Sequence, residues 1–227
     1  MNTRELVNYL QGLAENNNRA WFVMNKPSYD ILRAEFTELV GRVIAATAKF
    51  DPAVAGQDAK KALFRINRDM RFSKDKSPYK SHFSAIIAPA GKKDPGSHYY
   101  FHIDQAGKLL VAGGCYMPPP DVLLKIRRRI AAEPAAFKRM VGNKAMTDYY
   151  GGAFSDEAKL ARPPKGFDAD TPNLEFVKQK SFIMVREMPV KSMTTEKLLA
   201  EVQGGFKASL PLVKWLRETV AAPVAGS

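Results

Sequence analysis

The chain has 227 residues, of which 45% are hydrophobic and 26% charged, and its 35 Lys and Arg against 23 Asp and Glu give a formal net charge of +12. A chain of this length buries about 70% of its unfolded surface, so its stability requires neither a metal nor a disulfide. The single cysteine, Cys115, excludes an internal disulfide, and no apolar run approaches the roughly 18 to 20 residues of a spanning helix. The start, MNTRELVNYL, has no basic leader followed by an apolar run. We therefore expect a cytoplasmic protein with no cofactor and no membrane partner, whose positive charge attracts phosphates or nucleic acid.

Two helices are predicted at the start of the chain, because apolar residues recur there at helical spacing. The first has Thr3 as its N-cap and ends near Glu15. The second runs from Pro27 to about Lys49. Its apolar stripe consists of Tyr29, Leu32, Phe36, Leu39, Val43 and Thr47.

A corner is predicted between these two helices, where Trp21 and Phe22 follow the sequence NNNR. The two aromatic side chains are expected to anchor the helices to each other rather than to form a platform for a ligand. Asn16 and Arg19 are expected to cap or tie the corner.

Residues 64–72 alternate between apolar and polar side chains, the pattern of a half-buried strand. The even positions hold Phe64, Ile66, Arg68, Met70 and Phe72, and the odd positions hold Arg65, Asn67, Asp69 and Arg71. A strand would turn Arg65 and Arg71 to one face and Arg68 to the other, among the apolar side chains. We expect Arg68 to be buried and paired with an acidic residue, because an unpaired buried guanidinium is very unfavourable.

An α+β fold is predicted, with a central antiparallel sheet of about four to six strands flanked by helices from the N-terminal and C-terminal parts of the chain. Further strands are expected at 81–89, 98–104, 109–116 and 181–189, and helices at 117–130, 134–141, 171–180 and, as one or two elements, 194–220. Residues 146–170, rich in Gly, Pro and Asp, are expected to form loops. The whole is expected to be a single domain over 1–220, with a disordered tail at 221–227.

Positive charge is concentrated between residues 60 and 82, where eight Lys and Arg stand against Asp69 and Asp75, a local balance of +6. The residues expected to bind an anion are Arg65, Arg71, Lys74, Lys76 and Lys80. An arginine would form two parallel hydrogen bonds to the anion, and a lysine would act as a point charge. Tyr79 is expected to stack on a ring of the ligand or to donate a hydrogen bond from its hydroxyl. Arg68 and Asp75 are expected to position these side chains without contacting the ligand themselves. The alternative is a network of ion pairs on an exposed surface, each worth at most about 1 kcal/mol.

Acid–base candidates come from the same region and from the strand at 98–104. Asp69 and His102 are the tentative catalytic pair. His98 and His102 should share a strand face at about 13 Å, too far apart to bind one metal, so no metal site is expected. Cys115 follows two glycines that permit a bulge or a close backbone approach, and its thiol is expected to be structural.

Several phrases together resemble the bacterial family catalogued as domain of unknown function 2461. They are NNNRAWFVMNKPSYD, FRINRDMRFSKDKSPYKSHFSA, YYFHID with LLVAGGCYMPPPDVLLKIRRRI, and RPPKGFDADTP with KQKSF, over about residues 4 to 216. The resemblance implies a single α+β domain and no established reaction. The family is expected to have a His before the Pro of GFDADTP, where this chain has Thr171.

Three functions are compatible with these residues, and the sequence leaves it uncertain whether the protein is an enzyme. The first is a site on the central sheet for a phosphorylated or anionic small molecule, with Asp69 and His102 as the acid–base groups of any reaction there. The second is a nucleic-acid-binding module that uses the same cations, with Tyr79 for stacking. The third is a structural or interaction protein whose charged cluster is only an ion-pair network.

Overall fold

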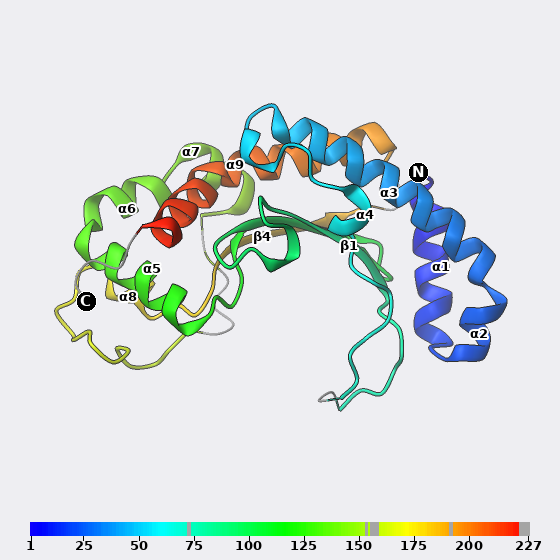
Figure 1. Cartoon of the computed structure of the whole chain (residues 1–227), viewed down its shortest axis with the longest axis horizontal. Helices are drawn as coiled ribbons and strands as arrows, with labels where there is room; N and C mark the ends of the chain where they lie inside the picture. The colour runs from blue at the N-terminus through cyan, green and yellow to red at the C-terminus, as the bar shows by residue number, and fades with distance from the viewer. Residues whose placement is uncertain (72–73, 153, 155–158, 191–192, 223–227) are drawn as a thin grey trace. The chain divides into compact units, whose positions relative to one another are not determined.

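The computed structural model describes residues 1–71, 74–152, 154, 159–190 and 193–222 (Figure 1). Its elements are α1 (Thr3–Glu15), α2 (Arg19–Met24), α3 (Lys26–Ala48), η1 (Pro52–Val54), α4 (Ala59–Ala62), β1 (His82–Ile87), η2 (Gly91–Lys93), β2 (His98–Asp104), β3 (Lys108–Cys115), α5 (Pro120–Ala132), α6 (Pro134–Val141), α7 (Lys144–Tyr150), α8 (Leu174–Val177), β4 (Phe182–Pro189) and α9 (Thr195–Ala221). The strands form one antiparallel sheet in the order β1-β2-β3-β4. The predicted α+β class with a central sheet is therefore confirmed. Of the predicted disordered tail, residues 223–227 lie outside the described part of the chain.

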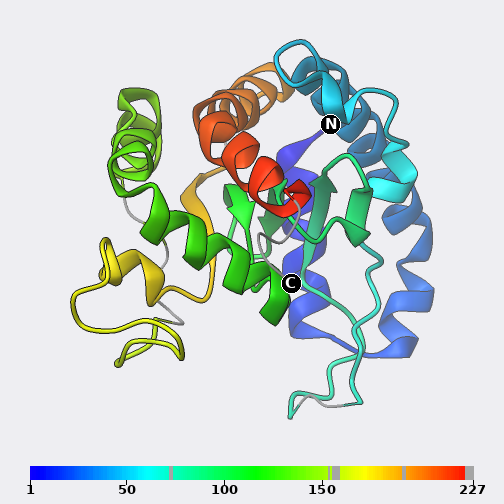
Figure 2. The same ribbon diagram turned by 60° about the vertical axis from the view of Figure 1, so that its left-hand side comes forward.

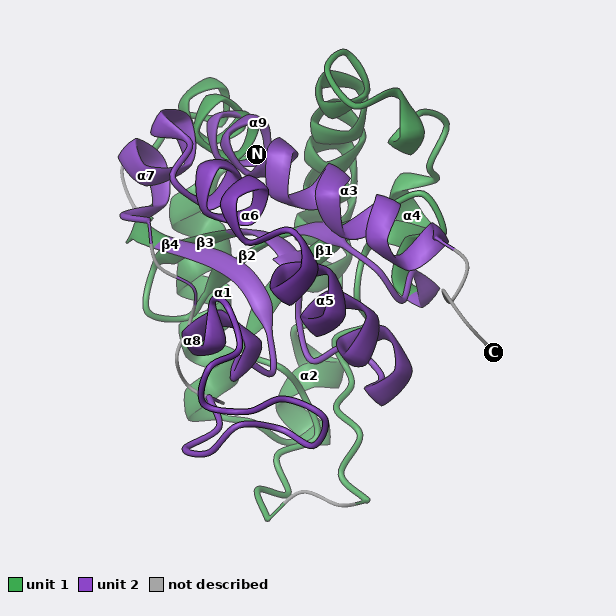
Figure 3. Ribbon diagram, turned by 90° about the vertical axis from the view of Figure 1, so that its left-hand side faces the viewer, with its two compact units in different colours: residues 1–92, 100–111, 187–203 green, residues 93–99, 112–186, 204–227 purple. Residues whose placement is uncertain are grey.

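The chain divides into two compact units (Figure 3). The first unit contains residues 1–92, 100–111 and 187–203, and the second contains residues 93–99, 112–186 and 204–227. The sequence predicts one domain over 1–220 and shows no boundary of this kind. Among the described residues, no helix is both long and apolar enough to cross a membrane.

The first unit is built on the two predicted N-terminal helices, both of which are confirmed. Leu6, Leu10 and Leu13 of α1 are completely buried, as the helical spacing predicted. The N-cap of α1 is Asn2 rather than Thr3, and its side chain accepts hydrogen bonds from the backbone N–H groups of the first turn. In α3, Phe36 lies 5.5 Å from the ring centroids of both Phe83 and Phe101, so that α3 covers one face of β1 and β2.

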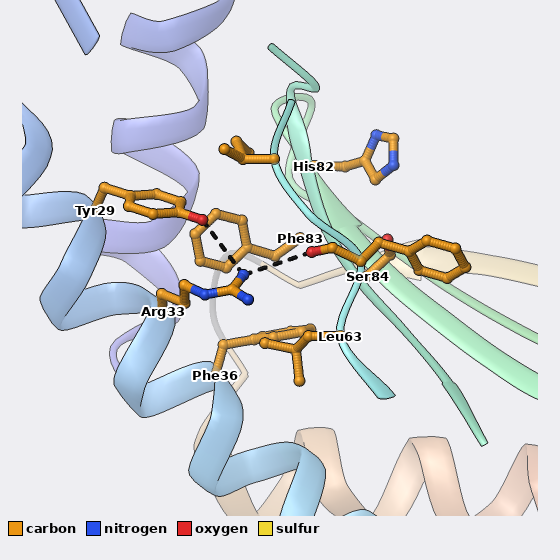
Figure 4. A pocket seen from close by; sticks show the side chains of 9 residues that line it. Tyr29, Arg33, Phe36, Leu63, His82, Phe83 and Ser84 are labelled. Atoms are coloured by element: carbon orange, nitrogen blue, oxygen red, sulfur yellow. Dashed lines mark hydrogen bonds between the residues drawn. The ribbon is translucent and has the colours of Figure 1, made fainter. Parts of the chain in front are cut away.

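The other face of β1 and β2 carries polar side chains. Along β2 every second residue is buried, so that Phe101 and Ile103 are inside while Tyr100 and His102 are only partly covered. In β1, His82 points away from the side on which Phe83 meets α3 (Figure 4). This alternation produces a polar face on β1 and β2, formed by His82, Ser84, Tyr100 and His102.

The second unit has a separate core, formed by α5 to α8, the C-terminal part of α9 and adjoining strand residues. Its centre is the ring of Phe137, completely buried and 5.2 Å from the ring of Trp215. The helix α7 was not predicted, since residues from 146 onward were expected to form loops. Asn143 caps this helix through the backbone N–H groups of its first turn, while Met146 and Tyr150 bury one face.

The two glycines before Cys115 allow close approaches of the backbone, as predicted. A Cβ at Gly113 would lie 2.0 Å from the Ser209 hydroxyl oxygen, and one at Gly114 would lie 2.1 Å from the carbonyl oxygen of Phe182. Cys115 itself is 2% exposed, and burial raises the pKa of its thiol to about 12. A thiol that stays protonated at neutral pH fits the predicted structural role.

Gly114→Ala is expected to lower the free energy of unfolding by about 3 kcal/mol or more, because the new methyl group would overlap a backbone oxygen that no side-chain rotation can move. Gly151→Ala is the matched control: Gly114 and Gly151 have φ angles of +135° and +80°, but a Cβ at Gly151 meets nothing within 4 Å. Its cost should be about 1 kcal/mol, from backbone strain alone. Urea unfolding measures both values, and equal losses would contradict the close approach at Gly114.

Candidate functional site

The described residues of the basic stretch, 64–71 and 74–80, form an extended arm that projects beyond β1 (Figure 2). The backbone N–H of Phe64 donates to Ser84 at 3.0 Å and that of Lys80 to Ile66 at 2.8 Å. The predicted strand at 64–72 is wrong, because only isolated bridges join Leu63 to Ala85 and Asn67 to Tyr79. Pro78, opposite Arg68, has no N–H to donate, so the ladder cannot continue. Residue 72 of that expectation lies outside the described part of the chain.

The root of the arm is fixed by Asn17, in the connection between α1 and α2. Its side-chain amide donates to the carbonyl of Tyr79 and accepts from the N–H of Tyr79, both at 3.0 Å. The ring of Tyr79 stacks on Phe22 with centroids 4.2 Å apart. Tyr79 is 7% exposed, so its ring faces cannot stack on a base or sugar, and the proposed stacking role is not available to it.

Arg68 pairs with Asp75 across the arm, as expected for this arginine, but it is not buried. Its side chain is 27% exposed. Asp75 also accepts hydrogen bonds from Ser77, at 2.9 Å from the backbone N–H and 2.6 Å from the hydroxyl. These bonds, and then Arg68, hold the pKa of the Asp75 carboxyl well below its usual range. Asp75 is therefore ionised and keeps Arg68 in place.

Arg71 and Asp69 form a second pair near the end of the arm. The guanidinium donates to both carboxylate oxygens of Asp69, at 3.0 and 2.7 Å, which lowers the pKa of that carboxyl. The side chain of Arg71 is 77% exposed. Arg71 thus folds back onto its neighbour, and the charge of Arg65 also lowers the pKa of the Asp69 carboxyl, as the last of its causes. Held in this pair as an ionised carboxylate, Asp69 is a weak candidate for a general base.

A hollow of about 500 Å³ opens beside the arm and will be called the arm hollow. It is lined by Ala14, Asn17, Arg68, Asp69, Asp75, Ser77, Tyr79, Lys80, Ser81 and His82. Of the predicted ligand-binding residues, the lining includes Tyr79 and Lys80 but not Arg65, Arg71, Lys74 or Lys76. Lys76 instead donates to the carbonyl of Met70 at 3.1 Å.

The histidine at the arm hollow is His82, not the predicted His102. The two imidazole rings lie 5.2 Å apart on the polar face, and Nδ1 of His102 is 3.1 Å from the hydroxyl of Tyr100. Burial, followed by the charges of His102 and Lys80, lowers the pKa of His82 to about 4. Burial also lowers the pKa of His102. Both imidazoles are therefore neutral at pH 7 and can accept a hydrogen bond. Within the described ranges, no group of three or more His, Cys, Asp and Glu is placed to hold a metal.

Lys80 connects the arm hollow to the ring of Phe64. Its ammonium donates to the carbonyl of Arg65 at 3.1 Å and lies 5.2 Å from the centroid of the Phe64 ring. Burial, and then the charge of Arg65, lowers the pKa of Lys80. A bound anion would offset both effects, so Lys80 is the residue of the arm best placed to hold one.

Sequence reasoning missed the role of Asn17. The run NNNR predicted the corner between the two helices, but the sequence does not distinguish the roles of its three asparagines. In the structure Asn18 caps α2, Asn16 donates to its own helix at Gly12, and Asn17 reaches the arm. Spacing along the chain cannot show which asparagine meets a partner 62 residues away.

Asn17→Ala is expected to loosen the arm, because it removes both hydrogen bonds to the Tyr79 backbone, worth about 1 kcal/mol each. Amide exchange at Arg68 and Lys80, whose N–H groups donate across the arm, should become about 10- to 100-fold faster. Asn16→Ala is the matched control, since the side chain of Asn16 donates to the carbonyl of Gly12 in its own helix, and it should leave these amides unchanged. Unchanged exchange in Asn17→Ala would show that the arm is held elsewhere.

The stability of the protein should depend on the neutral state of His82. Its pKa is lowered from 6.5 to about 4, so the unfolded chain binds this proton more readily than the folded protein. The contribution, at most about 3 kcal/mol, is complete above about pH 6.5 and is lost as the pH falls toward 4. In His82→Gln, the fall in the free energy of unfolding between these pH values should be smaller, as measured by urea unfolding. Titration of the His82 imidazole near pH 6.5 by NMR would contradict this.

The comparisons with known proteins give one match. No curated protein and no solved structure matches this chain. The family model described as conserved hypothetical protein (DUF2461) matches residues 5–215, nearly the whole chain, in agreement with the resemblance found in the sequence. The chain therefore belongs to the family of domain of unknown function 2461.

Proposed function

We propose that the protein binds a small molecule with an anionic group in the arm hollow. The observation that carries this proposal is that Arg68, Lys80 and His82 all line the same hollow of about 500 Å³. This volume lies within the range of about 300 to 1,000 Å³ that is typical of ligand sites. The protein would bind this ligand in the cytoplasm, and no reaction is proposed for it.

Lys80 is the group that would hold the anion. An ammonium has three N–H donors, and one of those of Lys80 is used on the carbonyl of Arg65. In the described part of the chain no carboxylate forms an ion pair with Lys80, whereas Arg68 and Arg71 each have one. A cation that is partly buried and has no acidic partner gains the most from an added anion.

The remainder of the ligand is expected to be compact and polar. Ser77, Ser81 and two carboxylates line the arm hollow, and the ring of Tyr79 is stacked on Phe22 and 7% exposed. The nucleic-acid alternative relies instead on the exposed cations Arg71, Lys74 and Lys76, which suit backbone phosphates.

Binding of inorganic phosphate and of glucose 6-phosphate tests the proposal, with the His82 imidazole resonances as the readout. Lys80→Ala should weaken binding by about 10-fold or more, equivalent to about 1.4 kcal/mol. Lys74→Ala is the matched control, because it removes the same charge from the same arm but not from the arm hollow, and it should change affinity by less than about 2-fold.

Two results would reject this function. One is the absence of any shift at His82 with either probe. The other is an equal loss of affinity in Lys74→Ala and Lys80→Ala, which would show that only overall charge matters. Retention of an oligonucleotide that falls steeply with salt and is weakened in Lys74→Ala and Lys76→Ala would support the nucleic-acid alternative instead.

A further inference from the structure

A second lysine meets Lys80 at the ring of Phe64. Lys92, in the short helix η2 after β1, has its ammonium 5.3 Å from the centroid of this ring, and the ammonium of Lys80 is 5.2 Å from it. The same ring makes an edge contact with Tyr100, which belongs to the polar face. Two cations from different segments thus share one aromatic ring beside the polar face.

Both ammonium groups are positioned by the backbone of the arm. Lys92 donates to the carbonyl of Leu63, and Lys80 donates to that of Arg65. Between them, the carbonyl of Phe64 accepts from Arg33 of α3 at 3.5 Å. Arg33 approaches from the side of Tyr29 and Phe36, where a cavity of only about 10 Å³ remains, room for about one water (Figure 4). The two lysines, but not Arg33, are therefore the groups that can meet a larger ligand.

Neither lysine has a negative partner among residues 1–71, 74–152, 154, 159–190 and 193–222. Other cations of the first unit do have one: Lys26 pairs with Asp30 at 2.5 Å, and Lys108 with Glu187 at 2.8 Å. The pKa of Lys92 is lowered by burial and then by the charge of Arg33, and the pKa of Lys80 is lowered by burial, Arg65 and Lys92. The positive charges of these side chains therefore repel one another, and no carboxylate among the described residues pairs with either lysine.

Cation–π contact alone does not account for this arrangement. One ammonium over a ring gains about 0.5 to 1 kcal/mol at an exposed site, but a second one adds mutual repulsion. Two ammonium groups with unused N–H donors suit an anion that carries more than one charge and several acceptor oxygens. A phosphate monoester has about −1.5 to −2 charge at pH 7 and three such oxygens, whereas a carboxylate has a single charge.

We propose that Lys80 and Lys92, the two ammonium groups that contact the ring of Phe64, form a subsite for a phosphate monoester at the side of the arm hollow. The inference rests on the proposed function, since Lys80 belongs both to this subsite and to the lining of the arm hollow. The phosphate binds between the two ammonium groups, and the polar remainder of the ligand occupies the arm hollow beside His82. The ligand class is thus a small polar phosphate ester, such as a sugar phosphate.

The test measures the affinity of three probes by calorimetry: glucose 6-phosphate, gluconate and glucose. Lys92→Ala should weaken glucose 6-phosphate binding by about 10-fold or more and bring it close to that of gluconate. Lys93→Ala is the matched control, because it removes the same charge from the same short helix η2, and it should change affinity by less than about 2-fold. Lys92→Gln keeps a donor for the Leu63 carbonyl but has no charge, so it should lose affinity while retaining the folded arm.

The outcomes separate this inference from the proposed function. Loss of binding in Lys80→Ala with unchanged binding in both Lys92 variants would overturn the subsite and leave the arm hollow as the ligand site. Full affinity in Lys92→Gln with loss only in Lys92→Ala would also overturn it, because the role of Lys92 would then be structural. If the unmodified protein binds neither glucose 6-phosphate nor gluconate, both proposals fail.

Discussion

The packing of Phe36 against Phe83 and Phe101 is the contact on which the first unit depends. It places α3 over one face of β1 and β2 and so decides which face stays open. Since side chains alternate along a strand, burying those two rings forces His82 and His102 to the other side. Each buried aromatic ring contributes roughly 2 to 3 kcal/mol, whereas an exposed ion pair contributes at most about 1, so apolar burial sets this arrangement and the charges adapt to it.

The charges of the arm then separate into two kinds. Arg68 and Arg71 are held by Asp75 and Asp69, and these pairs lie at a partly or largely exposed surface where their net value is small. Lys80 and Lys92 lie against a ring and backbone carbonyls instead. The number of cations in the sequence is therefore a poor guide to a binding site. These two lysines differ from the arginines because burial lowers their pKa values while no carboxylate pairs with them among the described residues. A sequence shows neither property.

Most of the fold could be predicted from the sequence, because helical spacing and period-two alternation are local properties. The helices α1, α3, α5, α6 and α9 and all four strands were expected close to where they occur. The strand at 64–72 was wrong for a reason that local pattern cannot supply: alternation belongs to one segment, but a ladder also needs a partner with N–H groups, and Pro78 has none. Lys92 was missed because its contact with Phe64 depends on how the chain returns from β1, which no local pattern shows.

The hydrogen bonds between Asn17 and Tyr79 also bear on the order in which the protein assembles. They join residues 62 positions apart, and closing so long a loop is entropically unfavourable until other contacts have brought its ends together. The arm can be fixed in place only after the corner between α1 and α2 and the first strand have met. The arm hollow is then a late feature of folding, and a partly folded chain displays the cations of the arm to any passing polyanion before it presents a shaped site.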